Sequence, residues 1–417
     1  MAKLMESMKK YEVRQCFEGV MLLFAATSSM SIYTVLSVLG VADAYTSIVF
    51  KMTSILITLY IFIKTAYKYE KKRNDLYIAL ILILIPILCT MTIFSRGYLH
   101  EAYRGYYLGY FVCIPQAMLA GRLMADKGKT IPWGYSILVF AMISNIGMLR
   151  VLNSGVPPYY SIYGTNYQVL AYIGTYTFIL LAFSIMKFHD LFHVEGNREK
   201  TYKLIILCSI VISVIAVVKG QGRGAQILFL ITGIYFVFSF LKRNRMLSKR
   251  NVLLGIVALS LCTVLGIQYF NIGGVLLQGR LGETIYGLLQ DPVGYFIANK
   301  RGKLIIAALQ GFRKSPILGN GLGSIFYEVG EYSHNIFTDV FCEQGLIGFI
   351  VLISICFLVL RRYWTYRKDG RAQLAFLIMF AGFFLLLLSG YYLYHSEIWF
   401  GLGFIMTIND KGKRINE

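Results

Sequence analysis

The chain has 417 residues, of which 57% are hydrophobic and only 15% are charged, and its mean hydropathy is +0.61. Ordinary soluble domains of this length are far less apolar, so composition excludes a water-soluble protein and indicates an integral membrane protein. The formal net charge of +20 is interpreted as Lys and Arg residues that hold loops at an anionic inner leaflet, and no nucleic acid is expected as a partner.

Long apolar runs divide the chain from one end to the other. Spanning the hydrocarbon takes about 20 residues whose backbone polar groups are satisfied within the segment, so each run predicts a helix. The sequence therefore predicts an all-α, polytopic membrane protein with about twelve transmembrane helices, in which residues 1–417 form a single membrane domain. The predicted spans are Cys16–Leu39, Tyr45–Tyr67, Tyr77–Ser95, Tyr106–Ala125, Trp133–Leu149, Tyr167–Met186, Leu204–Val218, Ala225–Leu241, Val252–Tyr269, Asn335–Leu360, Leu374–Ser389 and Glu397–Ile408.

The orientation of these spans follows from the connections between them. Most of the 41 Lys and Arg residues lie at the two termini and in alternate connections, and connections rich in Lys and Arg face the cytoplasm. Both termini are therefore predicted to be cytoplasmic. The remaining connections would face outward, and the longest of them is one extracytoplasmic loop, residues 270–334, between the ninth and tenth spans.

Arg223 is the first candidate site residue along the chain, in the tight turn Lys219–Gly224. Glycines on both sides of it leave room for a bound anion, and snorkelling to a lipid phosphate is the alternative interpretation. Arg301, in the long outer loop, has the same two interpretations. Two fixed guanidinium groups that open on one outer cavity could hold a diphosphate through bidentate hydrogen bonds.

The second half of the long loop concentrates polar features. Its segment Lys303–Phe312 is apolar with a basic edge, which predicts a short helix lying in the membrane interface. Gly319, Gly321 and Gly323 follow it and predict a tight turn. A nucleotide site is excluded, because no strand precedes these glycines and no Gly-Lys-Ser/Thr follows them. The basic cluster of this loop consists of Lys300, Arg301, Lys303, Arg313 and Lys314.

His334 ends the loop, at the outer end of the tenth span. An isolated histidine is usually structural, but an imidazole beside a basic cluster can accept a hydroxyl proton near neutral pH. Asp339 and Glu343 follow within the span, where a buried carboxylate needs a partner, and they either orient the site or cap the packing. The sequence has no metal motif or acidic pair, so neither a metal nor another cofactor is expected. The seven cysteines are interpreted as small core residues.

Taken together, these patterns resemble the bacterial O-antigen ligase and O-antigen polymerase superfamily. The resemblance covers mainly Lys219–Leu360. It differs from many members in having Gly302–Ile305 where those members have an aromatic residue. The motifs that carry it are Gly222-Arg223-Gly224-Ala225 at the start of a span, Arg301 followed by Lys314-Ser315-Pro316 and a glycine-rich turn, and His334-Asn335 leading to Glu343-x-Gly345-x-x-Gly348.

The resemblance implies a multi-pass glycosyltransferase of the bacterial plasma (inner) membrane that acts on undecaprenyl-diphosphate-linked glycans on the outer side, without a nucleotide sugar or a metal. It implies that Arg223 and Arg301 face the donor diphosphate and that His334 is catalytic. Lys300, Arg280 and Asn335 are further substrate-binding candidates that the resemblance does not cover.

A polymerase of O-antigen or capsular repeat units is the function that we expect. The close alternative is a ligase that transfers the glycan to lipid A-core. A flippase or other transporter is less favoured, because transporters place charged residues near the bilayer midplane and often have two repeated halves. The expected partners are a lipid-linked glycan donor and acceptor, membrane lipids, and the chain-length regulator and flippase of the same pathway.

Overall fold

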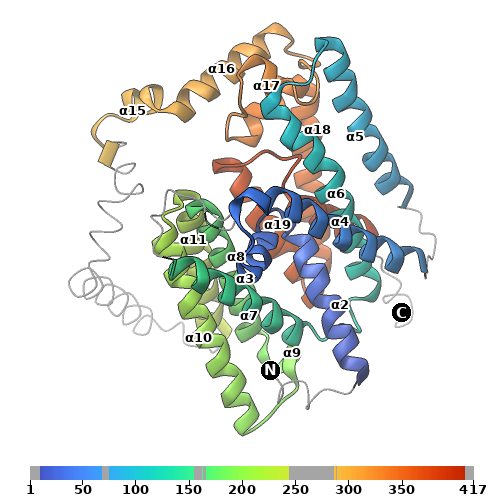
Figure 1. Cartoon of the computed structure of the whole chain (residues 1–417), viewed down its shortest axis with the longest axis vertical. Helices are drawn as coiled ribbons and strands as arrows, with labels where there is room; N and C mark the ends of the chain where they lie inside the picture. Colours follow the sequence, from blue (N-terminus) through green and yellow to red (C-terminus); the bar gives the residue numbers. More distant parts are fainter. Residues whose placement is uncertain are drawn as a thin grey trace. The chain divides into compact units, whose positions relative to one another are not determined.

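Every regular element that the structure describes is an α-helix, which confirms the predicted fold class for this part of the chain. The structure is a computed structural model that describes residues 10–67, 75–154, 162, 166–243, 286–287 and 289–408. The helices, most of which are labelled in Figure 1, are α2 (Lys10–Ala26), α3 (Ser28–Leu39), α4 (Asp43–Tyr67), α5 (Asp75–Arg96), α6 (Glu101–Lys127), α7 (Trp133–Leu152), α8 (Tyr167–Met186), α9 (Phe188–Phe192), α10 (Asn197–Gly220), α11 (Arg223–Arg243), α15 (Pro292–Ala298), α16 (Lys300–Lys314), α17 (Ile325–Glu328), α18 (Ile336–Tyr366), α19 (Gly370–Leu388) and α20 (Ser396–Thr407).

Many of these helices can cross a membrane, which confirms a polytopic membrane protein. Within the described ranges, nine are long and apolar enough, and the bent pair Val13–Ala26 and Met30–Leu39 makes a tenth if it is counted as one span. The number is lower than the twelve spans predicted. One of the missing spans, Val252–Tyr269, lies outside the described residues.

Two predicted spans differ from the helices that the structure contains. The run Cys16–Leu39 is not one helix, because the chain bends by 116° between α2 and α3. At the bend, the Thr27 hydroxyl donates to the Leu23 carbonyl at 2.8 Å, and hydroxyl groups that bond the preceding turn favour helix bending. The run Glu397–Ile408 forms α20, whose 12 residues are too few to cross the hydrocarbon.

The chain divides into two compact units, which are described separately. Unit 1 comprises Met1–Ile32, Ile48–Pro132 and Phe296–Glu417, and unit 2 comprises Tyr33–Ser47 and Trp133–Tyr295. Unit 1 contains α5, α6 and α16 to α20, and unit 2 contains α7 to α11. A single membrane domain with an outer loop over residues 270–334 remains a prediction, and of that loop the structure describes 286–287 and 289–334.

Helix α20 packs against α6 and α19 in unit 1. A Cβ atom at Gly121 of α6 would lie 2.0 Å from the Phe400 carbonyl oxygen, and one at Gly403 of α20 would lie 2.1 Å from the Met118 carbonyl oxygen. Small residues let two membrane helices bring their backbones into contact. The two glycines therefore fix α20 on α6, and with it the turn that leads from α19 into α20.

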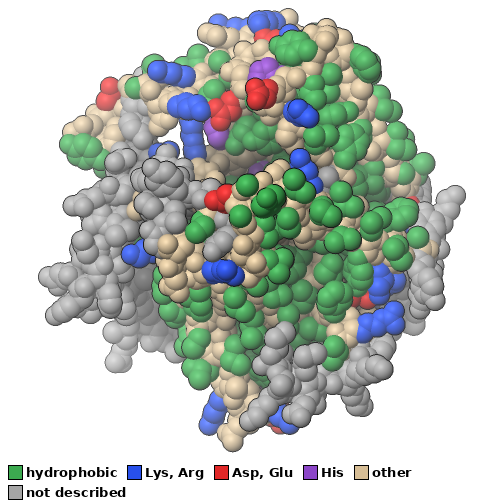
Figure 2. All heavy atoms as spheres, viewed as in Figure 1, with side chains coloured by type: hydrophobic (Ala, Val, Ile, Leu, Met, Phe, Trp, Pro, Cys, Tyr) green, Lys and Arg blue, Asp and Glu red, His purple; other side chains and the backbone are tan. Residues whose placement is uncertain are grey.

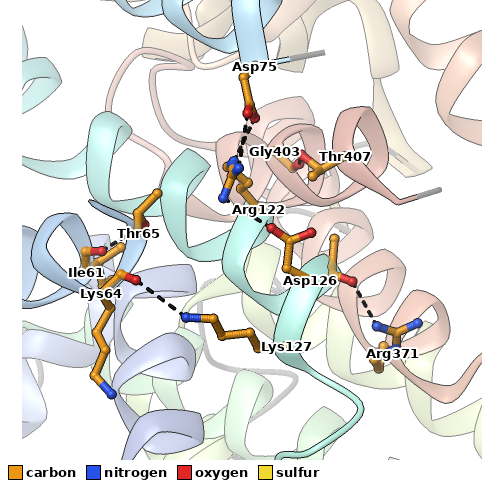
Figure 3. Close-up of polar contacts among 11 residues, drawn as sticks. Ile61, Lys64, Thr65, Asp75, Arg122, Asp126, Lys127, Arg371, Gly403 and Thr407 are labelled. Atoms are coloured by element: carbon orange, nitrogen blue, oxygen red, sulfur yellow. Dashed lines mark hydrogen bonds and ion pairs between the residues drawn. The ribbon is translucent and has the colours of Figure 1, made fainter. Parts of the chain in front are cut away.

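A buried ion-pair network joins α5 to α6 in unit 1, at the N-terminal end of α5 (Figure 3). Arg122 Nε donates to Asp75 Oδ1 at 2.6 Å, and its Nη1 donates to Asp126 Oδ2 at 3.1 Å. The side chain of Arg122 is only 4% exposed, and a buried guanidinium is stable only when its charge is paired in this way. Arg371 Nη1 donates to the Ala125 carbonyl at 2.9 Å, and this hydrogen bond joins the start of α19 to the end of α6.

Helix α8 is the centre of unit 2, where it packs against α7, α10 and α11. The Thr175 hydroxyl of α8 donates to the Ala225 carbonyl of α11 at 3.2 Å. Helix α10 ends at Gly220 and α11 begins at Arg223, with Gln221 between them in the left-handed conformation at φ 49°. This confirms the tight turn predicted over Lys219–Gly224 and places Arg223 at the first residue of α11.

Candidate active site

Helix α16 presents the basic cluster of the long loop. The sequence predicted a short helix over Lys303–Phe312, and the observed helix covers Lys300–Lys314. It starts earlier because the Asn299 side chain caps it, accepting a hydrogen bond from Arg301 N at 3.1 Å. A Cβ atom at Gly311 would lie 2.7 Å from a cysteine sulfur of α18, so α16 rests closely on that helix. The cap and this contact fix Lys300 and Arg301 in the first turn of α16.

Helix α18 is broken at Gly345, where φ is 61° and ψ is −157°. The break frees two carbonyl groups before it and two N–H groups after it, and membrane segments leave no such group unsatisfied. The glycine-rich stretch that follows α16 supplies all four partners. The bonds run from Asn320 N to Cys342 O (3.1 Å), from Gly321 N to Glu343 O (2.8 Å), from Leu346 N to Pro316 O (2.9 Å) and from Ile347 N to Ile317 O (3.2 Å).

Glycine is required on both sides of this backbone interlock. A Cβ atom at Gly345 would lie 2.5 Å from the Ile317 carbonyl oxygen, and one at Gly319 would lie 2.3 Å from the Glu343 carbonyl carbon. Gly319 and Gly321 also have positive φ angles, of 73° and 96°. The tight turn predicted from these glycines is confirmed, and its partner is the interior of α18.

His334 lies just before α18, with its imidazole among charged and aromatic side chains. Its Nε2 is 3.5 Å from Glu331 Oε1, and Glu331 Oε2 in turn receives Lys300 Nζ at 2.6 Å. The ring centroid of Tyr332 is 4.3 Å from that of His334. The side chain of His334 is 15% exposed, and its buried Nδ1 has no hydrogen-bond partner among the described residues. The structure thus brings His334 together with Lys300, at the start of α16, through Glu331.

The pKa of His334 is lowered from 6.5 to about 4. Burial is the main cause, because removal from water disfavours the charged imidazolium. The positive charges of Arg301 and Lys300 lower this pKa further, while the Glu331 carboxylate opposes them. His334 is therefore neutral at pH 7 and has one ring nitrogen with a free lone pair, and the lowered pKa also makes that nitrogen a weaker base than a free imidazole.

The backbone of His334 is left-handed, with φ at 63°. Both of its neighbours are held by α18. Ser333 donates to the fully buried carboxylate of Asp339 from its backbone N at 2.8 Å and from its hydroxyl at 2.6 Å. The Asn335 side chain caps α18, accepting from Phe337 N at 3.0 Å, so its amide oxygen is already engaged.

Glu343 lies one turn below Asp339 and is also fully buried. The hydroxyl of Tyr391 donates to its Oε1 at 2.8 Å, and the hydroxyl of Tyr392 donates to its Oε2. Both tyrosines belong to the turn between α19 and α20. The two hydrogen bonds satisfy the buried carboxylate and tie that turn to the broken helix.

An aromatic cluster extends from Tyr332, the ring that contacts His334, and the sequence analysis missed it. Tyr106 of α6 packs edge-on against Tyr332 at 5.5 Å and against Tyr391 at 5.5 Å, and Phe326 of α17 packs against Tyr391 at 5.0 Å. Burial raises the pKa of the Tyr332 hydroxyl far above its usual range, so the group stays neutral. Four separate segments supply these rings, and only their abundance was visible in the sequence.

A second polar cluster lies beside α17. Arg96, at the end of α5, donates to Glu328 Oε1 at 2.7 Å, and Lys314 donates to the other oxygen. Burial by itself would raise the pKa of Glu328, but these two hydrogen bonds outweigh it and the pKa is lowered. Figure 2 shows Lys, Arg, Asp, Glu and His side chains gathered over the part of the surface where α16 and α17 lie.

The predicted site residues are divided between the two units. Arg223 belongs to unit 2, whereas Arg301, Lys300, His334 and Asn335 belong to unit 1. Arg280 lies outside the described residues. Within the ranges that the structure describes, no group of three or more His, Cys, Asp or Glu side chains is placed to hold a metal ion.

The fold and the site thus define a polytopic α-helical membrane protein with an imidazole at the end of a broken helix. Comparison with known families extends this description, because the family model described as O-antigen ligase matches residues 208–353. The match includes Arg223, Arg301 and His334, and it supports the O-antigen ligase and O-antigen polymerase superfamily that the resemblance predicted. No curated protein and no solved structure matches the chain. The family supports a function of the ligase or polymerase type and implies lipid-linked glycan substrates.

Proposed function

We propose that the protein polymerises undecaprenyl-diphosphate-linked repeat units of an O-antigen or capsular polysaccharide on the outer side of the plasma membrane. The observation that carries this proposal is the state of His334. Its imidazole is neutral at pH 7, faces a carboxylate through Nε2, and lies in the field of Arg301. A general base needs such a neutral nitrogen beside the site of proton transfer.

The reaction would be one displacement at an anomeric carbon. The acceptor hydroxyl oxygen forms the new glycosidic bond, the bond from the anomeric carbon to the donor diphosphate breaks, and undecaprenyl diphosphate leaves with the electron pair. The hydroxyl proton passes to His334. Arg301, and Arg223 by the same resemblance, would stabilise the charge that develops on the leaving diphosphate.

Glu331 would set the tautomer of the base. Its carboxylate favours the proton on Nε2, 3.5 Å away, which leaves the lone pair on Nδ1. Nδ1 is enclosed in the present conformation. We therefore expect the ring to turn about its Cβ–Cγ bond when the acceptor binds, and the resulting imidazolium to be stabilised by Glu331.

A ligase is the second candidate, because the matching family is described as O-antigen ligase and its match does not distinguish a ligase from a polymerase. The two functions share their chemistry and differ only in the acceptor, which is a second lipid-linked unit for a polymerase and lipid A-core for a ligase. Purified protein would receive a lipid-linked repeat unit alone or together with lipid A-core, and the products would be resolved by length.

The proposal expects a ladder of lipid-linked multimers from the repeat unit alone, absent with His334→Ala. A single shift of lipid A-core, seen only in the second mixture, would replace the polymerase by a ligase. Transport of the intact lipid-linked unit across vesicles, with no new glycosidic bond in either mixture, would overturn the enzymatic proposal in favour of a flippase.

A further inference from the structure

We infer that Asp339 and Ser333 are positioning residues of the active site, which hold His334 in its left-handed backbone conformation. This inference rests on the proposed role of His334 as the base. It assigns a function to a buried carboxylate that does not touch His334 and takes no part in the chemistry itself.

The left-handed conformation of His334 needs an external restraint. A residue with a Cβ atom is sterically disfavoured at φ 63° and persists there only when its surroundings fix it. Free of restraint, the backbone would return to negative φ and carry the imidazole away from its position beside Glu331. The structure must therefore hold the residues on both sides of His334.

The hydrogen bonds of Ser333 and Asn335 provide that restraint. Asn335, which follows His334, is fixed as the cap of α18, because its Oδ1 accepts a hydrogen bond from Phe337 N at 3.0 Å. Ser333, which precedes His334, is fixed by two hydrogen bonds to Asp339 Oδ1, one from its backbone N at 2.8 Å and one from its hydroxyl at 2.6 Å. The Ser333 hydroxyl also lies 2.5 Å from the Thr338 hydroxyl. His334 is thus the single residue between two clamped neighbours.

Capping of α18 does not explain Asp339. The Asn335 side chain already accepts from the N–H groups of Phe337 and Thr338, at 3.0 Å and 3.4 Å. Asp339 instead reaches back to Ser333, which lies before the capping residue. Its exposure is 0%, and its Oδ2 has no hydrogen-bond partner among the described residues. An apolar residue would fit this buried position at lower cost if only helix stability were required.

The test compares Asp339→Leu with Asp339→Asn in the full-length protein, purified in detergent. Leucine removes both hydrogen bonds, whereas asparagine keeps an Oδ1 acceptor and loses nothing at the unpaired Oδ2. We expect Asp339→Leu to lower kcat about 100-fold, as a misplacement of about 1 Å does, with little change in KM for the lipid-linked donor. Asp339→Asn should retain most of the activity, and Ser333→Ala, which keeps the backbone donor, should lie between them.

A second readout does not depend on activity. The histidines are labelled with ¹³C at Cε1, and the resonance of His334 is identified by its loss in His334→Ala. In the wild-type protein it should titrate near pH 4, because the ring is buried beside Arg301 and Lys300 of α16, with Glu331 and Tyr332 of the preceding loop against it. In Asp339→Leu its midpoint should rise toward 6.5 as the ring is released to water.

Asp369→Leu is the matched control. Asp369 caps α19 in the same unit by accepting from Arg371 N at 2.9 Å, so its removal tests the loss of a capping aspartate elsewhere. We expect it to lower thermal stability without moving the His334 titration. If Asp339→Leu does not accumulate, Ser333→Ala carries the test, with a smaller shift in the same direction.

The outcomes separate this inference from the proposed function. The His334 titration could shift in Asp339→Leu although the wild-type protein forms no product. That result would support the positioning role of Asp339 and Ser333 and contradict the catalytic role of His334. The wild-type protein could instead be active while Asp339→Leu is folded and has an unchanged kcat and an unchanged His334 titration. That result would contradict only the positioning role of Asp339 and Ser333. Equal losses in Asp339→Asn and Asp339→Leu would also overturn it, because charge and not geometry would then be what Asp339 supplies.

Discussion

At the scale of single residues, the ionisation of His334 makes the sharpest prediction. A base must be deprotonated to act, and the pKa of His334 is lowered from 6.5 to about 4 by burial and by the charges of Arg301 and Lys300. We therefore expect kcat/KM to stay level as the pH falls from 8 to about 5, and to halve near pH 4. The pH–rate profile of the purified protein, with its thermal unfolding followed at each pH, measures this.

Glu331 provides the control for that profile. Its carboxylate opposes the lowering of the His334 pKa, so Glu331→Gln should move the acidic limb to still lower pH. An acidic limb centred near pH 6.5 in the wild-type protein would mean that His334 is exposed to water during turnover, contrary to the structure.

The arginine candidates carry a separate prediction. A guanidinium can hold a diphosphate through two parallel hydrogen bonds, whereas a lysine is a point charge. Arg301→Lys and Arg223→Lys should therefore each reduce kcat about 10-fold or more while the protein still accumulates in the membrane. Arg313→Lys, at the exposed far end of α16, is the matched control and should leave activity unchanged. Full activity of the first two variants would assign those arginines to lipid headgroups.

How far the sequence predicted the site depends on the kind of residue. His334, Arg301 and Lys300 could be predicted, because an imidazole and a basic cluster at the end of an apolar run require an explanation wherever they occur. Glu331 and Tyr332 could not, because a carboxylate and a tyrosine in an outer loop are ordinary until folding brings them to His334. Asn335 was predicted to bind substrate and this stays a prediction, and the structure shows that its side chain also caps α18.

At the scale of helices, the interlock between α18 and the glycine-rich stretch predicts where the fold is least tolerant. Gly345→Ala places a Cβ atom 2.5 Å from the Ile317 carbonyl oxygen, at a backbone conformation that only glycine adopts freely. We expect a loss of about 1–3 kcal/mol or more in the free energy of unfolding, measured as a lower unfolding temperature in detergent and lower accumulation in the membrane.

Gly370→Ala is the control for this substitution. A Cβ atom at Gly370, in the first turn of α19, would meet no heavy atom within 4 Å, so stability should not fall. Equal stability of Gly345→Ala and Gly370→Ala would show that α18 closes into a continuous helix without the interlock.

The helices themselves were predictable to the extent that hydropathy determines them. Long apolar runs became single helices in α4 to α8, α10, α11 and α19. Hydropathy does not show which other groups form hydrogen bonds with the backbone of a helix. It therefore missed the bend after Thr27 and the break at Gly345, each of which lies inside an apolar run. It also overestimated α20, which is apolar because it is buried between α6 and α19, although it is too short to cross a membrane.

At the scale of the whole molecule, the orientation in the membrane remains a prediction from charge. Reporter fusions after Arg250 and Arg371 should report from the cytoplasm, and fusions near Tyr286 and Tyr392 from the outside, because the loops rich in Lys and Arg stay inside. A cytoplasmic signal from the Tyr286 fusion would place the long loop, and His334 with it, on the wrong side for an outer-face glycosyltransferase.

The central claim is that His334 deprotonates an acceptor hydroxyl as undecaprenyl diphosphate leaves. The most direct measurement is the release of undecaprenyl diphosphate by purified protein given a lipid-linked repeat unit, in buffer containing a metal chelator. We predict one lipid diphosphate released for each glycosidic bond formed, and a loss of about 100-fold or more in rate with His334→Ala. Glycan elongation at the wild-type rate in His334→Ala, or its complete loss on chelation, would contradict the account.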